Sequence, residues 1–331
     1  MNPELIHSLS SLRILSVDMI SYAKSGHPGI CLGAAPIIFT LYTNHLKVNP
    51  ADPKWINRDR FVMSAGHGSA LLYAMLFMAG YDISIDDLVE FRKIGSKTPG
   101  HPEYGVTPGV EVSTGPLGQG LANAVGMAMA EKYLGALLED EIPKQKIVDY
   151  YVYCLVGDGD IMEGVADEAA SLAGNLALDN LIVLYDSNDV TLDGPLKKAS
   201  NTSVIQKYIN MGWEVDFVPE GNETREIDKA IERAKMNRKP TLIEIKTTIG
   251  RGSQHEGKNL VHGKPLSRED MANLRKKYDI PTNTMEITEA AVKYGPPYIG
   301  LFPQKSIPDP SPDGGKSHRS VLVAAGFGLP L

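Results

Sequence analysis

The sequence has few cysteines, no excess of basic residues and no long apolar run. Its two cysteines, Cys31 and Cys154, lie far apart without a CxxC spacing, which gives no sign of a disulfide framework or a zinc site. Lys and Arg number 33 against 40 Asp and Glu, a net charge of -7, so nucleic acid and membranes are not expected partners. No signal-peptide pattern is present, and no apolar stretch approaches the ~18 residues that span a bilayer. These absences predict a cytoplasmic protein with reduced thiols.

What the sequence does contain is a regular alternation of strand and helix patterns. Beyond Lys146, β-branched and apolar runs predict strands at 147–156, 181–185, 213–218 and 241–247. Helix patterns lie between or beside them, at 163–178, 204–210 and 226–236. Strands that alternate with helices pair in parallel, so we predict an α/β fold with a doubly wound parallel sheet flanked by helices.

The first 146 residues and the last 46 differ from this pattern. An amphipathic helix is predicted over 4–22, and a short strand at 60–63 precedes an apolar helix that runs to Ala79. After about Glu289, prolines crowd a stretch with little apolar periodicity. We therefore expect one domain over residues 1–285 and a Pro-rich, disordered tail over residues 286–331.

Polar residues follow two neighbouring predicted strands. Gly157, Asp158 and Gly159 end the first strand, and Asn188 follows the next one. Ligands of open α/β sheets bind at the carboxyl ends of the strands. A carboxylate and an amide carbonyl there suit Mg²⁺ or Ca²⁺, and the glycines allow a diphosphate to approach. Taken alone, however, Gly-Asp-Gly is also a common turn, and Asn188 a common turn residue.

Four of the eight histidines lie in loops next to glycine or proline. A single loop histidine is more often structural, but four in such loops favour a functional site, because histidine can transfer protons and stabilise oxyanions. They are His27, His67, His101 and His262.

The segments that carry these residues resemble, in order, the signature segments of the transketolase family. The segments are 25–29, 64–68, 100–103, 115–120, 157–194 and 262–266. The resemblance extends from about Leu5 to Tyr278. It implies the thiamine-diphosphate-binding fold, thiamine diphosphate and a divalent cation (Mg²⁺, Ca²⁺ or another) as cofactors, and transfer of a two-carbon ketol unit between phosphosugars.

The resemblance also implies roles for single residues. Asp158, Asn188 and the Val190 carbonyl would bind the metal. The cofactor would contact His67, Gly115, Pro116, Leu117, Gly157, Gly159, Glu163 and His262, in addition to the metal ligands. His27, His101 and His262 would bind the sugar donor and assist proton transfer.

Two helical regions would lie near a subunit interface by the same resemblance. Glu163 and Glu168 match two acidic residues that link the active sites of a dimer, although on residue type alone they are solvated helix charges. The helix after Gly115 to Gly120 is rich in small residues, which predicts close backbone packing, either at a homodimer interface or within one subunit.

Thiamine diphosphate is activated by a glutamate that the family carries in a second, pyrimidine-binding domain. We find no such domain in this sequence, so activity is expected to need a pyrimidine-binding partner. Two alternatives stay open: a dihydroxyacetone synthase-like enzyme, and a non-catalytic truncated remnant that only binds the cofactor. A decarboxylating 2-oxo-acid dehydrogenase subunit is disfavoured by the four loop histidines.

Overall fold

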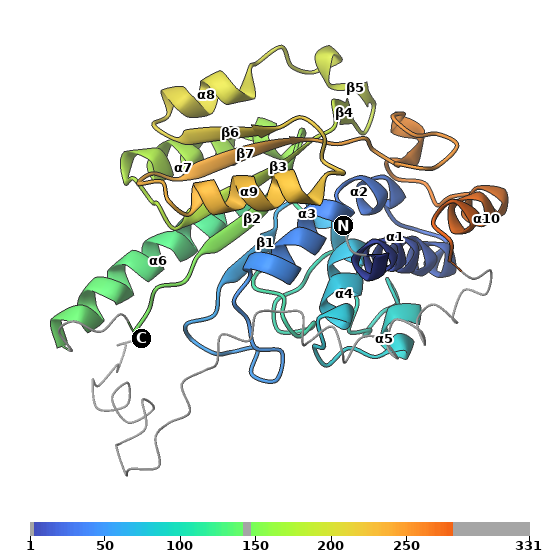
Figure 1. Cartoon of the computed structure of the whole chain (residues 1–331), viewed down its shortest axis with the longest axis horizontal. Coiled ribbons are helices and arrows are strands. Elements are labelled where there is room, and N and C mark those ends of the chain that lie inside the picture. Colours follow the sequence, from blue (N-terminus) through green and yellow to red (C-terminus); the bar gives the residue numbers. More distant parts are fainter. Residues whose placement is uncertain (1–2, 142–146, 281–331) are drawn as a thin grey trace, which may run out of the picture.

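A five-stranded parallel sheet forms the centre of the molecule (Figure 1). The computed structural model describes residues 3–141 and 147–280, with side chains for 5–138 and 147–280. The strand order is β1-β2-β3-β7-β6, and every pair is parallel. The strands are β1 (Arg60–Met63), β2 (Val152–Gly157), β3 (Leu181–Ser187), β6 (Glu214–Val218) and β7 (Thr241–Lys246). The predicted doubly wound sheet is confirmed.

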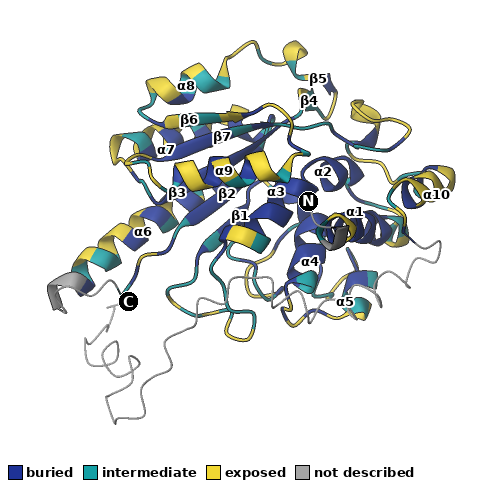
Figure 2. Cartoon of the chain, viewed as in Figure 1, coloured by how far each residue is buried: buried dark blue, intermediate teal, exposed yellow. Residues whose placement is uncertain are grey.

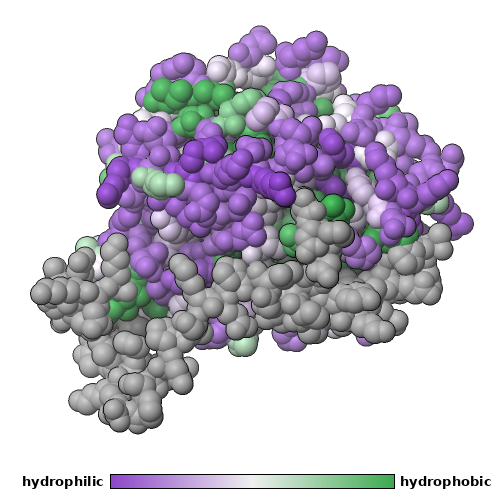
Figure 3. All heavy atoms as spheres, in the orientation of Figure 1, coloured by the Kyte–Doolittle hydropathy of each residue, from purple (hydrophilic) through white to green (hydrophobic). Residues whose placement is uncertain are grey.

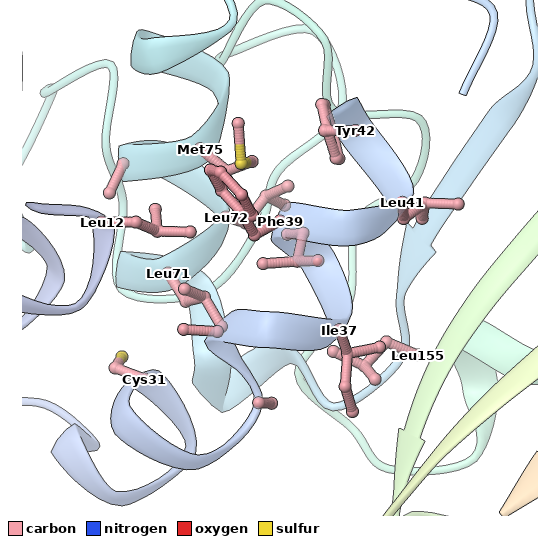
Figure 4. Close-up of a cluster of buried hydrophobic side chains, with 14 of the residues drawn as sticks. Leu12, Cys31, Ile37, Phe39, Leu41, Tyr42, Leu71, Leu72, Met75 and Leu155 are labelled. Carbon is pink, nitrogen blue, oxygen red and sulfur yellow. The ribbon is translucent and has the colours of Figure 1, made fainter. Parts of the chain in front are cut away.

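One face of the sheet packs into the larger of two hydrophobic clusters. Strand residues such as Leu155 and Ile243 contribute to it, together with Leu12, Ile37 and Leu71 from three helices (Figure 4). All five side chains are buried because helices enclose this face (Figure 2). The helices are α1 (Pro3–Ala23), α2 (Pro28–Gly33), α3 (Ala35–Thr40), α4 (Ser69–Met78) and α9 (Thr224–Ala234).

The opposite face packs into a second cluster. Cys154 and Val183 point into it, whereas their neighbours Leu155 and Leu184 belong to the first cluster. Successive side chains of a strand point to opposite faces, so strands buried on both sides are apolar throughout. The helices on this face are α6 (Gln119–Glu141), α7 (Gly164–Asn175) and α8 (Val204–Asn210).

Several predicted boundaries differ from the structure, and two of the differences have a structural reason. Strand β2 begins at Val152 instead of residue 147, because its partner β1 begins at Arg60, which is in register with Val152. The Tyr151 amide instead donates to the Asp59 side chain. Helix α7 begins at Gly164, and Glu163 is its extended N-cap residue, so Glu163 lies outside the helix in which it was predicted.

The small residues of α6 pack closely within this subunit at one glycine and not at another. A β-carbon added to Gly120 would lie 2.5 Å from the Cα of Ser64, so only glycine fits there. At Gly126 the same β-carbon would meet nothing within 4 Å, and the residue is exposed. Contacts within this subunit therefore do not explain Gly126.

The remaining elements are short or peripheral. Helix α5 (Ile85–Val89) starts with a capping box between Ser84 and Asp87, and α10 (Arg268–Lys277) is held to α1 by the buried Arg275–Asp18 ion pair at 2.5 Å. A two-residue hairpin joins β4 (Val190–Thr191) and β5 (Gly194–Pro195). Single turns complete the order: η1 (Leu41–His45), η2 (Gly66–Gly68), η3 (Asp160–Met162), η4 (Leu196–Lys198) and η5 (Asn259–Val261).

The surface facing the viewer is mainly hydrophilic, with a hydrophobic patch in the region of α8 and β6, where Ile209 and Phe217 are exposed (Figure 3). Among the described residues, no helix combines the length and hydropathy needed to cross a membrane. The predicted boundary at residue 285 and the tail over 286–331 lie outside the described residues.

Candidate active site

The four loop histidines come together from four separate segments. His27 caps the start of α2, His67 lies in η2, His101 lies in an irregular loop, and His262 follows η5. The ring centre of His27 is 5.2 Å from that of His67, 5.8 Å from that of His262 and 6.4 Å from that of His101. The rings of His67 and His262 stack at 5.1 Å. The structure thus joins residues that the sequence separates widely.

These rings border a cavity of about 520 Å³ at the carboxyl ends of β2 and β3. His27, His67 and His262 line it directly, and His101 lies beside Gly115, where an added β-carbon would be 3.4 Å from its ring. The other predicted site residues on the cavity wall are Gly115, Leu117, Gly157, Asp158, Gly159, Glu163, Asn188 and Val190. Pro116 is exposed and outside the lining, and Glu168 is an exposed residue of α7.

Burial lowers the pKa of all four histidines. Desolvation is the largest cause for each; it lowers the pKa of His27 to about 4 and that of His67 well below its usual value. The Arg92 guanidinium adds to the lowering at His27 and His101. At neutral pH the rings are therefore uncharged, and each carries one hydrogen-bond donor and one acceptor. Neutral imidazoles of this kind can both give and accept a proton.

We expect these histidines to make the fold sensitive to acid. His27 has a pKa of about 4 when folded and 6.5 in its ordinary state, so between these values the unfolded chain binds more protons. The free energy of unfolding should consequently fall as the pH falls from about 6.5 towards 4. Urea titrations across this range measure the slope. His27→Gln should flatten it, whereas the same change at the exposed His255 should not; an unchanged slope in the His27 variant would contradict the assignment.

Asp158 is a buried carboxylate without a positive partner. Its Oδ1 accepts a hydrogen bond from the Tyr185 hydroxyl, and its Oδ2 accepts one from the backbone N–H of Asn188 at 3.1 Å. No ion pair among the described residues includes it, and burial raises its pKa. An unpaired buried charge is costly, so a cation bound here would offset that cost.

The orientation of Asn188 suits the same cation. Its Nδ2 donates to Oδ2 of the buried Asp186 at 3.1 Å, which directs its carbonyl oxygen to the other side. That oxygen accepts from the Val190 amide at 3.1 Å and retains a second lone pair. The described residues contain no cluster of three or more His, Cys, Asp or Glu side chains fit for a metal. The set of Asp158, Asn188 and the Val190 carbonyl instead supplies three hard oxygens, which leaves room for phosphate oxygens.

The glycines around Asp158 leave space for a ligand. A β-carbon added to Gly157 would meet nothing within 4 Å, and one added to Gly159 would touch only the Leu117 side chain at 3.5 Å. Packing within this chain therefore does not explain why either position is glycine. Both line the cavity, so the space that a side chain would fill is open to a diphosphate group.

Asp160 fixes the adjacent Gly115–Gly120 loop. Its Oδ1 accepts from the amide of Gly118, a residue with a φ of 80° that only glycine adopts readily. Its second oxygen is buried and has no protein partner among the described residues. The carboxylate thereby ties the Gly115–Gly120 loop to the turn after β2. Asp160 adjoins the Gly-Asp-Gly motif, but its contact with a loop 42 residues away could not be predicted from the sequence.

Arg92 and Asp186 are the other residues that the sequence reasoning missed. Arg92 contacts Ser25 and His27, and Asp186 orients Asn188. Asp186 directly follows the strand predicted over 181–185, where an acidic residue next to an apolar run could have drawn attention. No pattern in the sequence distinguishes Arg92.

Comparisons with known proteins identify the family of the chain. Residues 6–294 match the family described as the transketolase, thiamine diphosphate-binding domain. A transketolase of Bacillus subtilis is 52% identical over 296 residues, which cover 86% of this chain and 44% of that protein. The structure of a transketolase from Campylobacter jejuni shares 45% identity with a TM-score of 0.84, over 91% of this chain and 47% of that one.

A second similar structure, a Pichia stipitis transketolase described as a complex with sedoheptulose 7-phosphate, is 42% identical with a TM-score of 0.81. The matched region covers 90% of this chain and 46% of the Pichia stipitis chain. The chain thus spans somewhat less than half the length of the relatives that it matches. Because its fold and its sequence match over most of its length, the chain belongs to the transketolase family and contains its thiamine diphosphate-binding domain.

Proposed function

We propose that this chain binds thiamine diphosphate through a divalent cation and takes part in transketolase chemistry, the transfer of a two-carbon ketol unit from a ketose phosphate to an aldose phosphate. The observation that carries the proposal is the single cavity that joins an unpaired Asp158 and an oriented Asn188 to three uncharged histidines. When bound, thiamine diphosphate supplies the carbanion chemistry that no side chain can provide.

The diphosphate end of the cofactor would lie against Gly157 and Gly159. Asp158, Asn188 and the Val190 carbonyl would hold the cation that clamps it, and both Mg²⁺ and Ca²⁺ accept such oxygen ligands. The Gly115–Gly120 loop would also contact the cofactor, because Gly115 and Leu117 line the same cavity. This arrangement would put the diphosphate next to the proposed metal ligands and the reactive part near the histidines.

The histidines would act on the sugar. His27 and His262 border the cavity and are uncharged, so they can hydrogen-bond substrate oxygens and move protons between them. His101 would contact a substrate hydroxyl from beside Gly115, and His67 would lie nearest the cofactor. The phosphosugar substrate class is proposed from the family and from the sugar phosphate in the Pichia stipitis complex.

We further propose that turnover requires a pyrimidine-binding region, either in the same polypeptide or in another. A homodimer or such a partner would cover the exposed apolar side chains of α6, η3 and α7, which are Met129, Tyr133, Met162, Val165, Leu172 and Leu176. Light scattering tests the dimer, and a strict monomer at high concentration would oppose it. The cytoplasmic location expected from the sequence stays a prediction.

Calorimetric titration of thiamine diphosphate into the chain, with Mg²⁺ and with a chelator, tests cofactor binding. We expect binding only with the metal. Turnover of xylulose 5-phosphate and ribose 5-phosphate should then appear when a separately produced pyrimidine-binding region is added. Metal-dependent binding without turnover in the mixture would favour a non-catalytic role, and no binding in any condition would refute the proposal.

A further inference from the structure

Arg92 reaches from the segment after α5 to the loop that carries His27. Its Nη1 donates to the Ser25 hydroxyl at 3.0 Å, and its Nη2 lies 3.3 Å from Nδ1 of His27. The backbone of Arg92 has a φ of 66°, a left-handed conformation that is uncommon for arginine, and its amide donates to the Thr98 carbonyl at 2.9 Å. A side chain held in this way has a defined position at the edge of the site.

The chemistry of arginine decides the direction of the bond to His27. A guanidinium carries only N–H donors and keeps its proton at any ordinary pH, so Nδ1 of His27 has to accept. A neutral imidazole has one ring proton, which must then be on Nε2. The lowered pKa of His27, caused first by burial and then by the charge of Arg92, agrees with a ring that stays neutral.

His27 lines the cavity, and its Nε2 is the ring nitrogen that does not contact Arg92. A β-carbon added to Gly263 would lie 3.6 Å from Nε2, and the ring centres of His67 and His262 lie 5.2 and 5.8 Å from that of His27. No residue in the described part of the chain bonds Nε2. Its proton is therefore available to a ligand.

We propose that Arg92 is a positioning residue that holds His27 as a hydrogen-bond donor, with its Nε2 proton directed into the cavity. His27 then donates a hydrogen bond from Nε2 to a substrate oxygen. Because Nε2 already carries a proton, a different group has to accept any proton that the substrate releases. The identity of that oxygen as a sugar oxygen rests on the proposed function; the orientation and protonation of the ring do not. Two contacts support a specific placement of Arg92: its Cζ lies 5.5 Å from the centre of the Phe91 ring, and a β-carbon on Gly100 would be 3.6 Å from its Cγ.

Nitrogen-15 NMR of the histidine rings in the full chain, without cofactor, tests the proposal directly. We expect Nε2 of His27 to show the shift of a protonated nitrogen and Nδ1 that of an unprotonated acceptor. The wild-type spectrum needs no variant to be decisive, since a protonated Nδ1 would overturn the proposal. In Arg92→Met the midpoint of His27 titration should move to higher pH, because a nearby positive charge is gone. Arg233→Met, which breaks a surface pair with Asp216, is the matched control and should leave His27 unchanged.

A second measurement separates this inference from the proposed function. In the mixture with a pyrimidine-binding region, Arg92→Met should lower kcat about tenfold or more while the dissociation constant of thiamine diphosphate changes little. Arg92→Lys keeps the charge but not the planar fork and should recover only part of the rate. An unchanged kcat in Arg92→Met would overturn the positioning role. A wild-type ring with the expected protonation in a mixture that shows no turnover would support the inference and refute the proposed function.

Discussion

Replacing Asp158 by asparagine should weaken metal-dependent binding of thiamine diphosphate by about 100-fold or more. The substitution preserves size but removes the only carboxylate among the three proposed metal ligands. Losing one partner of a buried charge pair costs about 2–5 kcal/mol, and each 1.4 kcal/mol is about tenfold in affinity. Calorimetric titration at fixed Mg²⁺ measures the loss. An affinity within a fewfold of the wild type would remove Asp158 from the metal site.

The same substitution should leave the metal-free chain at least as stable as the wild type. Burial raises the pKa of Asp158, so at neutral pH its ionised form weakens the folded state relative to the unfolded one, and the neutral amide lacks this penalty. Mg²⁺ with thiamine diphosphate should raise the melting temperature of the wild type but not of the variant. Asp179→Asn removes an equal charge near the amino end of β3, where Asp179 pairs with Lys132, and should retain cofactor binding.

Gly174→Ala should cause the largest loss of stability among the substitutions considered. An added β-carbon would lie 1.8 Å from the Met211 carbonyl oxygen and 3.2 Å from Cδ1 of Trp213. Neither can move alone, because Trp213 is buried and its Nε1 donates to the Ala170 carbonyl at 2.8 Å. Overpacking of this kind costs about 3 kcal/mol. We therefore expect a melting temperature roughly 6–12 °C lower.

Gly126→Ala provides the matched control, since it makes the same chemical change in a helix. Its β-carbon would meet nothing within 4 Å, and alanine is favoured over glycine in a helix by roughly 0.5–1 kcal/mol. Urea unfolding should thus show a loss in one variant and a small gain in the other. Equal stability of the two would mean that α7 does not approach the Met211–Trp213 segment as closely as the structure indicates.

Sequence patterns predicted the helices and strands well where the local spacing of apolar residues sets their bounds. The strand over 60–63 and the helix over 204–210 have the bounds expected from their apolar spacing. Asp158 and Asn188 lie at the carboxyl ends of neighbouring strands because β2 and β3 form consecutive parallel strands of one sheet. The periodicity of the side chains was sufficient for these features.

Features that depend on pairing across space were not accessible in this way. Strand β7 lies between β3 and β6, an order that no local pattern specifies. The start of β2 depends on where β1 begins. The contact from Arg92 to His27 spans 65 residues and requires a left-handed arginine, which composition does not reveal.

The proposed metal ligands and the histidines also differ in how far apart they lie along the chain. Asp158 and Asn188 are 30 residues apart, in one βαβ unit, whereas His27 and His262 lie near opposite ends of the described chain. Closing a short loop costs less entropy than closing a long one, so contacts within one unit form earlier during folding. A partly folded chain would therefore acquire the proposed cation site before the proposed sugar site, and early cation binding would stabilise the unit on which the rest of the sheet assembles.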